Sequence, residues 1–90
     1  MGKVAAEIER RLRAALAPSR LRVVDQSHLH AGHAGARPEG ETHFLVEVES
    51  EAFRGEAPVA RHRRVNALLA DLLRGPVHAL ALRARPPGEG

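Results

Sequence analysis

Histidine is the residue type of this chain best suited to binding a metal. Three of the six histidines, His28, His30 and His33, fall within a segment rich in glycine and alanine, and His62 stands at the centre of an Arg-His-Arg motif. The chain contains no cysteine and a single methionine, so imidazole is nearly its whole supply of soft or borderline metal ligands. This pattern indicates a site built from imidazoles and completed by ligands from another molecule.

Each of these histidines also has an interpretation other than a site completed by another molecule. The Gly/Ala segment fits a solvated loop, and its spacing His-x-His-x-x-His fits a zinc site, although zinc normally takes four well-oriented ligands. His62 fits the first turn of a helix, with its ring hydrogen-bonded locally. We expect His43 to be a structural or surface residue and His78 to be a hydrogen-bonded, partly buried one.

The composition indicates one small domain with an aliphatic core. The 90 residues include only two aromatic side chains, both phenylalanine, and no cysteine for disulfides, so the core must hold alone, which fits a reducing, cytoplasmic location. No apolar run approaches the roughly 20 residues of a membrane-spanning helix. The first residues lead directly into a helical pattern, so we expect no secretion signal and no membrane association. A net charge of +3 is compatible with nucleic acid or with an acidic protein partner.

Hydrophobic periodicity predicts the elements that position these side chains. Apolar residues recur at helical spacing over residues 3–17 and from Pro58 to about residue 74, where a proline in the first turn is favourable. Residues 42–50 alternate strictly between apolar and polar positions, which predicts a half-buried strand. The remaining predicted elements are strands at 21–25 and 77–84, one helical turn at 51–55 and a long loop at 26–40, which we expect to be the least ordered internal segment.

The order αββααβ predicts an α+β fold. It forms a single two-layer domain in which helices cover one face of a three-stranded mixed sheet. The usual handedness of the crossover makes the last strand parallel to residues 42–50. The domain comprises residues 1–90, with its core at about 3–85 and a flexible tail at 86–90. We expect a monomer, or a weak homodimer, when the protein is alone.

Six short motifs follow one another across about residues 20–85. They are Val23-Val24-Asp25-Gln26-Ser27, His30-Ala31-Gly32-His33-Ala34-Gly35, Glu41-Thr42-His43-Phe44, Ser50-Glu51-Ala52-Phe53-Arg54-Gly55, Arg61-His62-Arg63 and Gly75-Pro76-Val77-His78-Ala79-Leu80. In this combination and order, the chain resembles the BolA family, in its His-type subfamily. The resemblance implies a fold similar to the class II KH domain and a binding role, not an enzymatic one. Ala57, where the family often has serine, predicts a weaker helix cap.

The resemblance also implies a cofactor and a partner. Similar proteins associate with monothiol glutaredoxins and share a [2Fe–2S] cluster with them, in iron–sulfur cluster assembly, iron regulation or the response to oxidative stress. It implies His62 and His30 as cluster ligands, with His33 as an alternative to His30. A [2Fe–2S] cluster takes four ligands, and two imidazoles can replace two thiolates. Because this chain has no thiolate, a cysteine of the glutaredoxin and glutathione would complete the set.

DNA binding is the alternative function. Some BolA-like proteins have been treated as DNA-binding transcription regulators, and Arg61, Arg63 and Arg64 are candidate phosphate contacts. The Gly-x-x-Gly loop of KH domains is reduced to one glycine in residues 53–58, and the chain has almost no aromatic residue for base stacking, so we expect weak DNA binding. The chain has no cysteine nucleophile, Gly-x-Ser-x-Gly elbow or phosphate-binding glycine loop, which argues against an enzyme.

Overall fold

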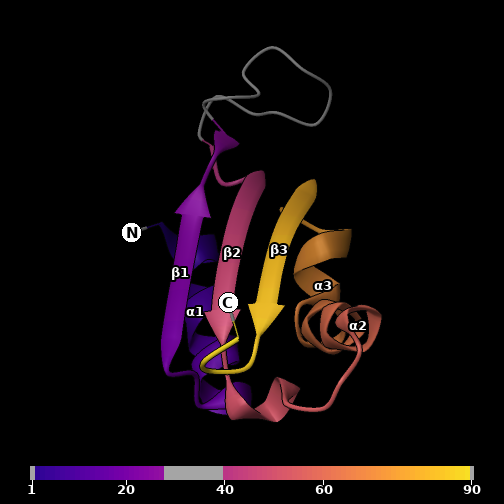
Figure 1. Cartoon of the computed structure of the whole chain (residues 1–90). Coiled ribbons are helices and arrows are strands. Elements are labelled where there is room, and N and C mark those ends of the chain that lie inside the picture. The colour runs from indigo at the N-terminus through magenta and orange to yellow at the C-terminus, as the bar shows by residue number, and fades with distance from the viewer. Residues whose placement is uncertain (1, 28–39, 90) are drawn as a thin grey trace.

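The fold has two layers, a mixed sheet and a set of helices on one of its faces. The computed structural model describes residues 2–27 and 40–89. Its elements are, in chain order, α1 (Lys3–Leu16), β1 (Arg20–Asp25), β2 (His43–Glu49), the 3-10 turn η2 (Glu51–Phe53), α2 (Pro58–Leu68), α3 (Ala70–Arg74) and β3 (Ala79–Arg85). β2 is central, with β1 antiparallel and β3 parallel to it. Figure 1 shows α1 behind β1 and β2, and α2 and α3 beside β3. The predicted α+β order and parallel last strand are confirmed.

The core lies between the sheet and the helices. Alternation along β2 directs Phe44, Val46 and Val48 to the inner face, where none is more than 3% exposed. Ile8 and Leu12, which follow one another at helical spacing in α1, are fully buried against that face. Burial of each such side chain contributes roughly 1.5–3 kcal/mol. The helix-covered face therefore stabilises the domain.

The long helix predicted from Pro58 to about residue 74 is divided into α2 and α3. Pro58 occupies the first turn of α2 as expected, and Ala57 provides no side-chain cap. The break falls at Leu69, whose φ of −111° and ψ of 13° are not helical. Leu69 is 1% exposed, so the break turns a large apolar side chain into the core. The prediction of one continuous helix was wrong. The apolar residues keep helical spacing across Leu69, so the spacing gives no sign of the break.

The chain end packs against the body of the domain. Arg61, in α2, is 7% exposed, and its guanidinium donates to the carbonyl oxygens of Glu56, at 2.9 Å, and Ala84, at 3.3 Å. The same group pairs with the Glu89 carboxylate at 2.8 Å, which lowers the pKa of that carboxyl. The segment 86–89 thus contacts the body of the domain through Glu89, and its flexibility stays a prediction.

Two further expectations concern the order of the loop at 26–40 and the lack of a membrane-spanning helix. The predicted loop at 26–40 falls mostly on residues 28–39, so its order lies outside the described residues. Within the described ranges, every helix is too short or too polar to cross a bilayer.

Candidate functional site

A buried hydrogen-bond network joins the end of β1 to the start of β2. Ser27 Oγ accepts hydrogen bonds from the backbone N–H groups of Thr42, at 2.8 Å, and His43, at 3.2 Å. Thr42 Oγ1 lies 3.2 Å from Ser27 Oγ and 2.8 Å from His43 Nδ1. All three residues are buried. Because their polar atoms satisfy one another, the network gives this edge of the sheet a fixed geometry.

Asp25 ties together the two chain positions that flank residues 28–39. Its Oδ1 accepts a hydrogen bond from the Ser27 N–H at 2.9 Å, and its Oδ2 accepts one from the Glu41 N–H at 3.0 Å. Glu41 adopts a left-handed φ of 58° at this point. Both ends of the segment that carries the three loop histidines are therefore attached at the same edge of the sheet. Those histidines themselves lie outside the described residues.

His43 and His78 meet at this same edge. Their ring centroids are 5.1 Å apart, with the ring planes inclined by 48°. They are brought together because His78 and Ala79 both donate backbone hydrogen bonds to the Thr42 carbonyl, at 2.7 and 3.1 Å. His43 is 6% exposed and bonded to Thr42, in agreement with a structural role. His78 is exposed, so the expectation that it is partly buried was wrong.

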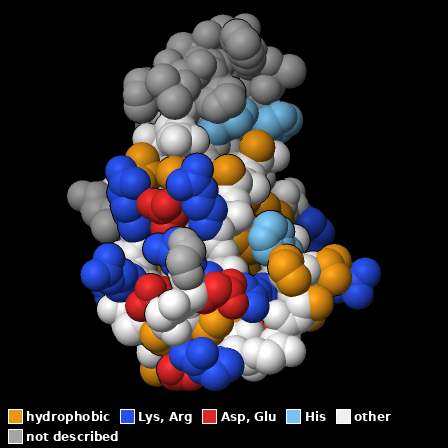
Figure 2. Space-filling view, in the orientation of Figure 1, with side chains coloured by type: hydrophobic (Ala, Val, Ile, Leu, Met, Phe, Trp, Pro, Cys, Tyr) orange, Lys and Arg blue, Asp and Glu red, His pale blue; other side chains and the backbone are white. Residues whose placement is uncertain are grey.

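His62 lies apart from this pair. It occupies an exposed position in α2. Figure 2 shows histidine side chains at two separate places, one at the upper edge of the sheet and the other lower, toward the helices. The structure therefore does not bring His62 together with His43 and His78. Over residues 2–27 and 40–89, no three metal-ligating side chains are clustered, so a metal centre here would need ligands from elsewhere.

The position of His78 beside Thr42 and His43 could have been predicted from the sequence, from the helix-ending Gly75-Pro76 and the parallel pairing of the last strand. Gly75-Pro76 ends the preceding helix and predicts that a strand begins shortly afterwards. A strand that pairs in parallel with residues 42–50 begins at the same edge of the sheet as that strand. The residue that precedes it must then lie beside Thr42 and His43, which is where His78 is found.

The three candidate phosphate-binding arginines differ in availability. Arg61 is buried against backbone carbonyls and the chain end, as described above. Arg64 pairs with Glu56 at 2.6 Å, and this hydrogen bond lowers the pKa of the Glu56 carboxyl. Arg63 is exposed and makes no ion pair with any described residue. The structure thus leaves Arg63 as the available one of the three in α2. The side chain of Arg61 points inward, which does not favour a phosphate contact, and its role stays a prediction.

Comparison with known sequences identifies the family. The family model described as BolA-like protein matches residues 12–89. BolA-like protein 1 from Homo sapiens is 47% identical over 89 residues, which cover 99% of this chain and 62% of that protein, so the chain spans less than two thirds of that relative. The DNA-binding transcriptional regulator BolA from Vibrio cholerae is 45% identical over 75 residues, covering 83% of this chain and 67% of that protein.

Solved structures show the same relationship. The BolA domain of SufE1 from Arabidopsis thaliana matches with a TM-score of 0.90 and 40% identity, over 100% of this chain and 99% of that one. The BolA1 protein from Mus musculus matches with a TM-score of 0.79 and 40% identity, over 97% of this chain and 68% of that one. The motifs, the element order and these matches agree, and the chain belongs to the BolA-like family.

Proposed function

We propose that this protein binds a monothiol glutaredoxin and shares a [2Fe–2S] cluster with it, in the assembly or regulation of iron–sulfur proteins. The observation that carries the proposal is an exposed imidazole, that of His78, at the edge of the sheet where a histidine-rich segment is attached by both its ends. The chain has imidazoles but no thiolate, which fits a cluster whose remaining ligands come from a partner.

The described contacts support His78, in place of His62, as the ligand from the folded part of the domain. The His78 imidazole packs beside His43 and makes no hydrogen bond within the described residues, so its ring nitrogens are available. Covalent geometry limits a residue three positions from Ser27 to about 11 Å from it, which keeps His30 within reach of this edge. We propose His30, or alternatively His33, as the second ligand. His62, on a separate helix, stays a prediction from the resemblance.

The remaining ligands define the partner. A cysteine thiolate of the glutaredoxin and the thiolate of glutathione would complete a set of two sulfur and two nitrogen ligands. The cluster would supply electron-transfer or cluster-transfer chemistry, and this chain would supply the two imidazoles and the surface that orients them. Imidazole ligands must lose a proton to bind a metal, so formation of the complex should be weakened by acid.

Anaerobic reconstitution tests the proposal and the choice of ligand together. The full chain is mixed with a monothiol glutaredoxin, glutathione, iron and sulfide, and visible circular dichroism distinguishes a mixed cluster from that of the glutaredoxin alone. We expect His78→Ala to abolish the mixed-cluster spectrum, His30→Ala to weaken it, and the matched exposed control His62→Ala to leave it unchanged.

The possible outcomes separate the alternatives. A lost spectrum in His62→Ala with an unchanged one in His78→Ala would restore His62 as the ligand. Wild-type spectra in His78→Ala, His62→Ala and the double variant His30→Ala/His33→Ala would overturn histidine ligation altogether.

DNA binding is the second candidate because the relative from Vibrio cholerae is named a DNA-binding transcriptional regulator. The available arginine in α2 is Arg63, while Arg61 and Arg64 are engaged in contacts within the domain. A single available arginine in α2 predicts little counterion release at this helix and therefore a shallow dependence on salt of DNA affinity through it. Tight, sequence-dependent binding of a DNA duplex by the isolated chain at physiological salt would favour this function over cluster binding.

A further inference from the structure

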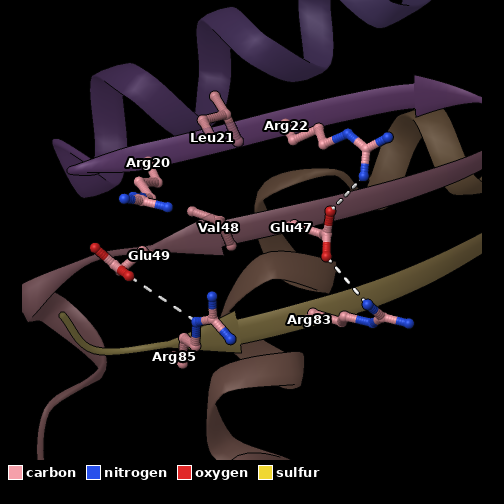
Figure 3. A pocket seen from close by; sticks show the side chains of 8 residues that line it. All are labelled: Arg20, Leu21, Arg22, Glu47, Val48, Glu49, Arg83 and Arg85. Atoms are coloured by element: carbon pink, nitrogen blue, oxygen red, sulfur yellow. Dashed lines mark hydrogen bonds and ion pairs between the residues drawn. The ribbon is translucent and has the colours of Figure 1, made fainter. Parts of the chain in front are cut away.

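The face of the sheet opposite the helices carries a regular array of charges. In each of two neighbouring rows, a glutamate of β2 stands between an arginine of β1 and an arginine of β3. The strand register gives the rows as Arg20–Glu49–Arg85 and Arg22–Glu47–Arg83. Figure 3 shows these side chains around a hollow of about 410 Å³ on the open face. We call these six residues the arginine array.

The row through Glu47 is fully paired. The Glu47 carboxylate accepts from Arg22 at 2.9 Å and from Arg83 at 3.1 Å. Arg22, followed by Arg83, lowers the pKa of the Glu47 carboxyl, so this carboxylate stays charged between its two arginines. Each guanidinium offers five N–H donors, and one contact with Glu47 leaves others directed at solvent.

The row through Glu49 is looser. Arg85 approaches Glu49 only to 3.9 Å, while Ser19 Oγ donates to the Glu49 carboxylate at 2.7 Å. The Arg20 guanidinium forms no hydrogen bond or ion pair with any described residue. Four guanidinium groups against two carboxylates leave the array with two positive charges in excess. An anionic group seated in the hollow would therefore meet the guanidinium donors of Arg20, which form no hydrogen bond or ion pair with any described residue.

An apolar row adjoins the arginine array on the same face. The register aligns Val24, Leu45 and Ala81 across the three strands. Figure 2 shows hydrophobic side chains directly above an alternation of basic, acidic and basic side chains, with histidines at the edge beyond them. None of these three apolar residues is buried. A ligand that covers this face would need both carboxylates and apolar groups.

We propose that the open face of the sheet is a docking surface for an acidic protein segment that also carries apolar side chains. Arginine beside half-exposed aliphatic residues is typical of protein interfaces. A phosphate backbone has no apolar groups to match the adjoining apolar row, and both phenylalanines are buried, so this face has no stacking platform for bases. The excess positive charge disfavours a second copy of the same face. The inference does not depend on cluster binding.

A defined peptide tests this surface on the full chain. The probe is a capped heptapeptide with four carboxylates and two leucines, titrated while backbone amide shifts are followed by NMR. Its carboxamide analogue and a single-stranded oligonucleotide with four phosphates serve as comparison ligands. We expect shifts to concentrate on the outward residues of the three strands, and Arg22→Gln/Arg83→Gln to weaken binding about tenfold, since two charge pairs are lost.

The matched control is Arg63→Gln/Arg74→Gln, which removes the same charge from exposed positions on α2 and α3. It should bind the acidic peptide like the wild-type chain. Equal weakening by both double variants would show unspecific attraction by net charge and overturn the proposal. So would an absence of peptide binding, equal binding of the carboxamide analogue, or tighter binding of the oligonucleotide at the same residues. A thermal melt of each variant verifies that it is folded.

Discussion

Ser27→Ala is expected to destabilise the domain by removing one buried hydroxyl. The variant removes the acceptor for two backbone N–H groups, those of Thr42 and His43, in residues that are 0% and 6% exposed. A buried donor left without a partner costs about 1–3 kcal/mol, so the pair should lower the free energy of unfolding by about 3 kcal/mol. For a domain of this size, that corresponds to a fall in Tm of about 12–24 °C.

Urea unfolding followed by far-UV circular dichroism measures this loss. The matched control is Ser19→Ala, whose hydroxyl bonds the Glu49 carboxylate at an exposed position and should change stability by less than about 0.5 kcal/mol. The amide signals of Thr42 and His43 should shift and exchange faster in Ser27→Ala. If the two serine variants lose equal stability, the buried network does not hold this edge of the sheet, and the reasoning is refuted.

Two further predictions concern contacts of α1. The Glu41 carboxylate caps α1 by accepting the otherwise unpaired N–H of Ala5 at 3.0 Å, and a Cβ at Gly2 would overlap this carboxylate. Gly2→Ala should therefore displace the cap and lower the free energy of unfolding by about 1 kcal/mol. Unchanged urea unfolding would contradict this prediction. Hydrogen bonds from Arg11 lower the pKa of Asp71 from 3.8 to about 2. Because the folded-state pKa is the lower one, the pair stabilises the fold at pH values above the unfolded-state pKa. This stabilisation is lost as the pH falls toward 2. Arg11→Gln should therefore be less stable than wild type at neutral pH, and the difference should shrink in acid; a constant difference in urea midpoint would argue against the pair.

The sequence predicts the elements well where one side of an element faces the core. The strict alternation around Phe44, Val46 and Val48 predicts β2, because a period of two has no other regular interpretation. The break at Leu69 was not predictable in the same way. Its spacing from Val65 is helical, and the backbone leaves the helix there because packing favours turning Leu69 inward, which no local pattern encodes.

Side-chain roles at the candidate site were harder to predict than the elements. Arg61 looks exposed in a helix that begins with several arginines, but its partners, Ala84 and Glu89, are distant in sequence. His78 looks like a strand residue with a buried face until its pairing partner is known. In both cases a contact between sequence-distant segments decides the role, and such contacts follow from topology, not from spacing along one element.

The two proposals can be tested without unfolding the domain because alternate side chains of β2 point into the core and to the open face of the sheet. Phe44 and Val46 point into the core, whereas Leu45 and Glu47 point to the open face. Since successive side chains of a strand lie on opposite faces, substitutions at the outward positions remove little apolar burial. His78 lies outside the core for a related reason, as it precedes β3 at the sheet edge. Loss of partner binding in these variants would then report the surface itself, and not the stability of the domain beneath it.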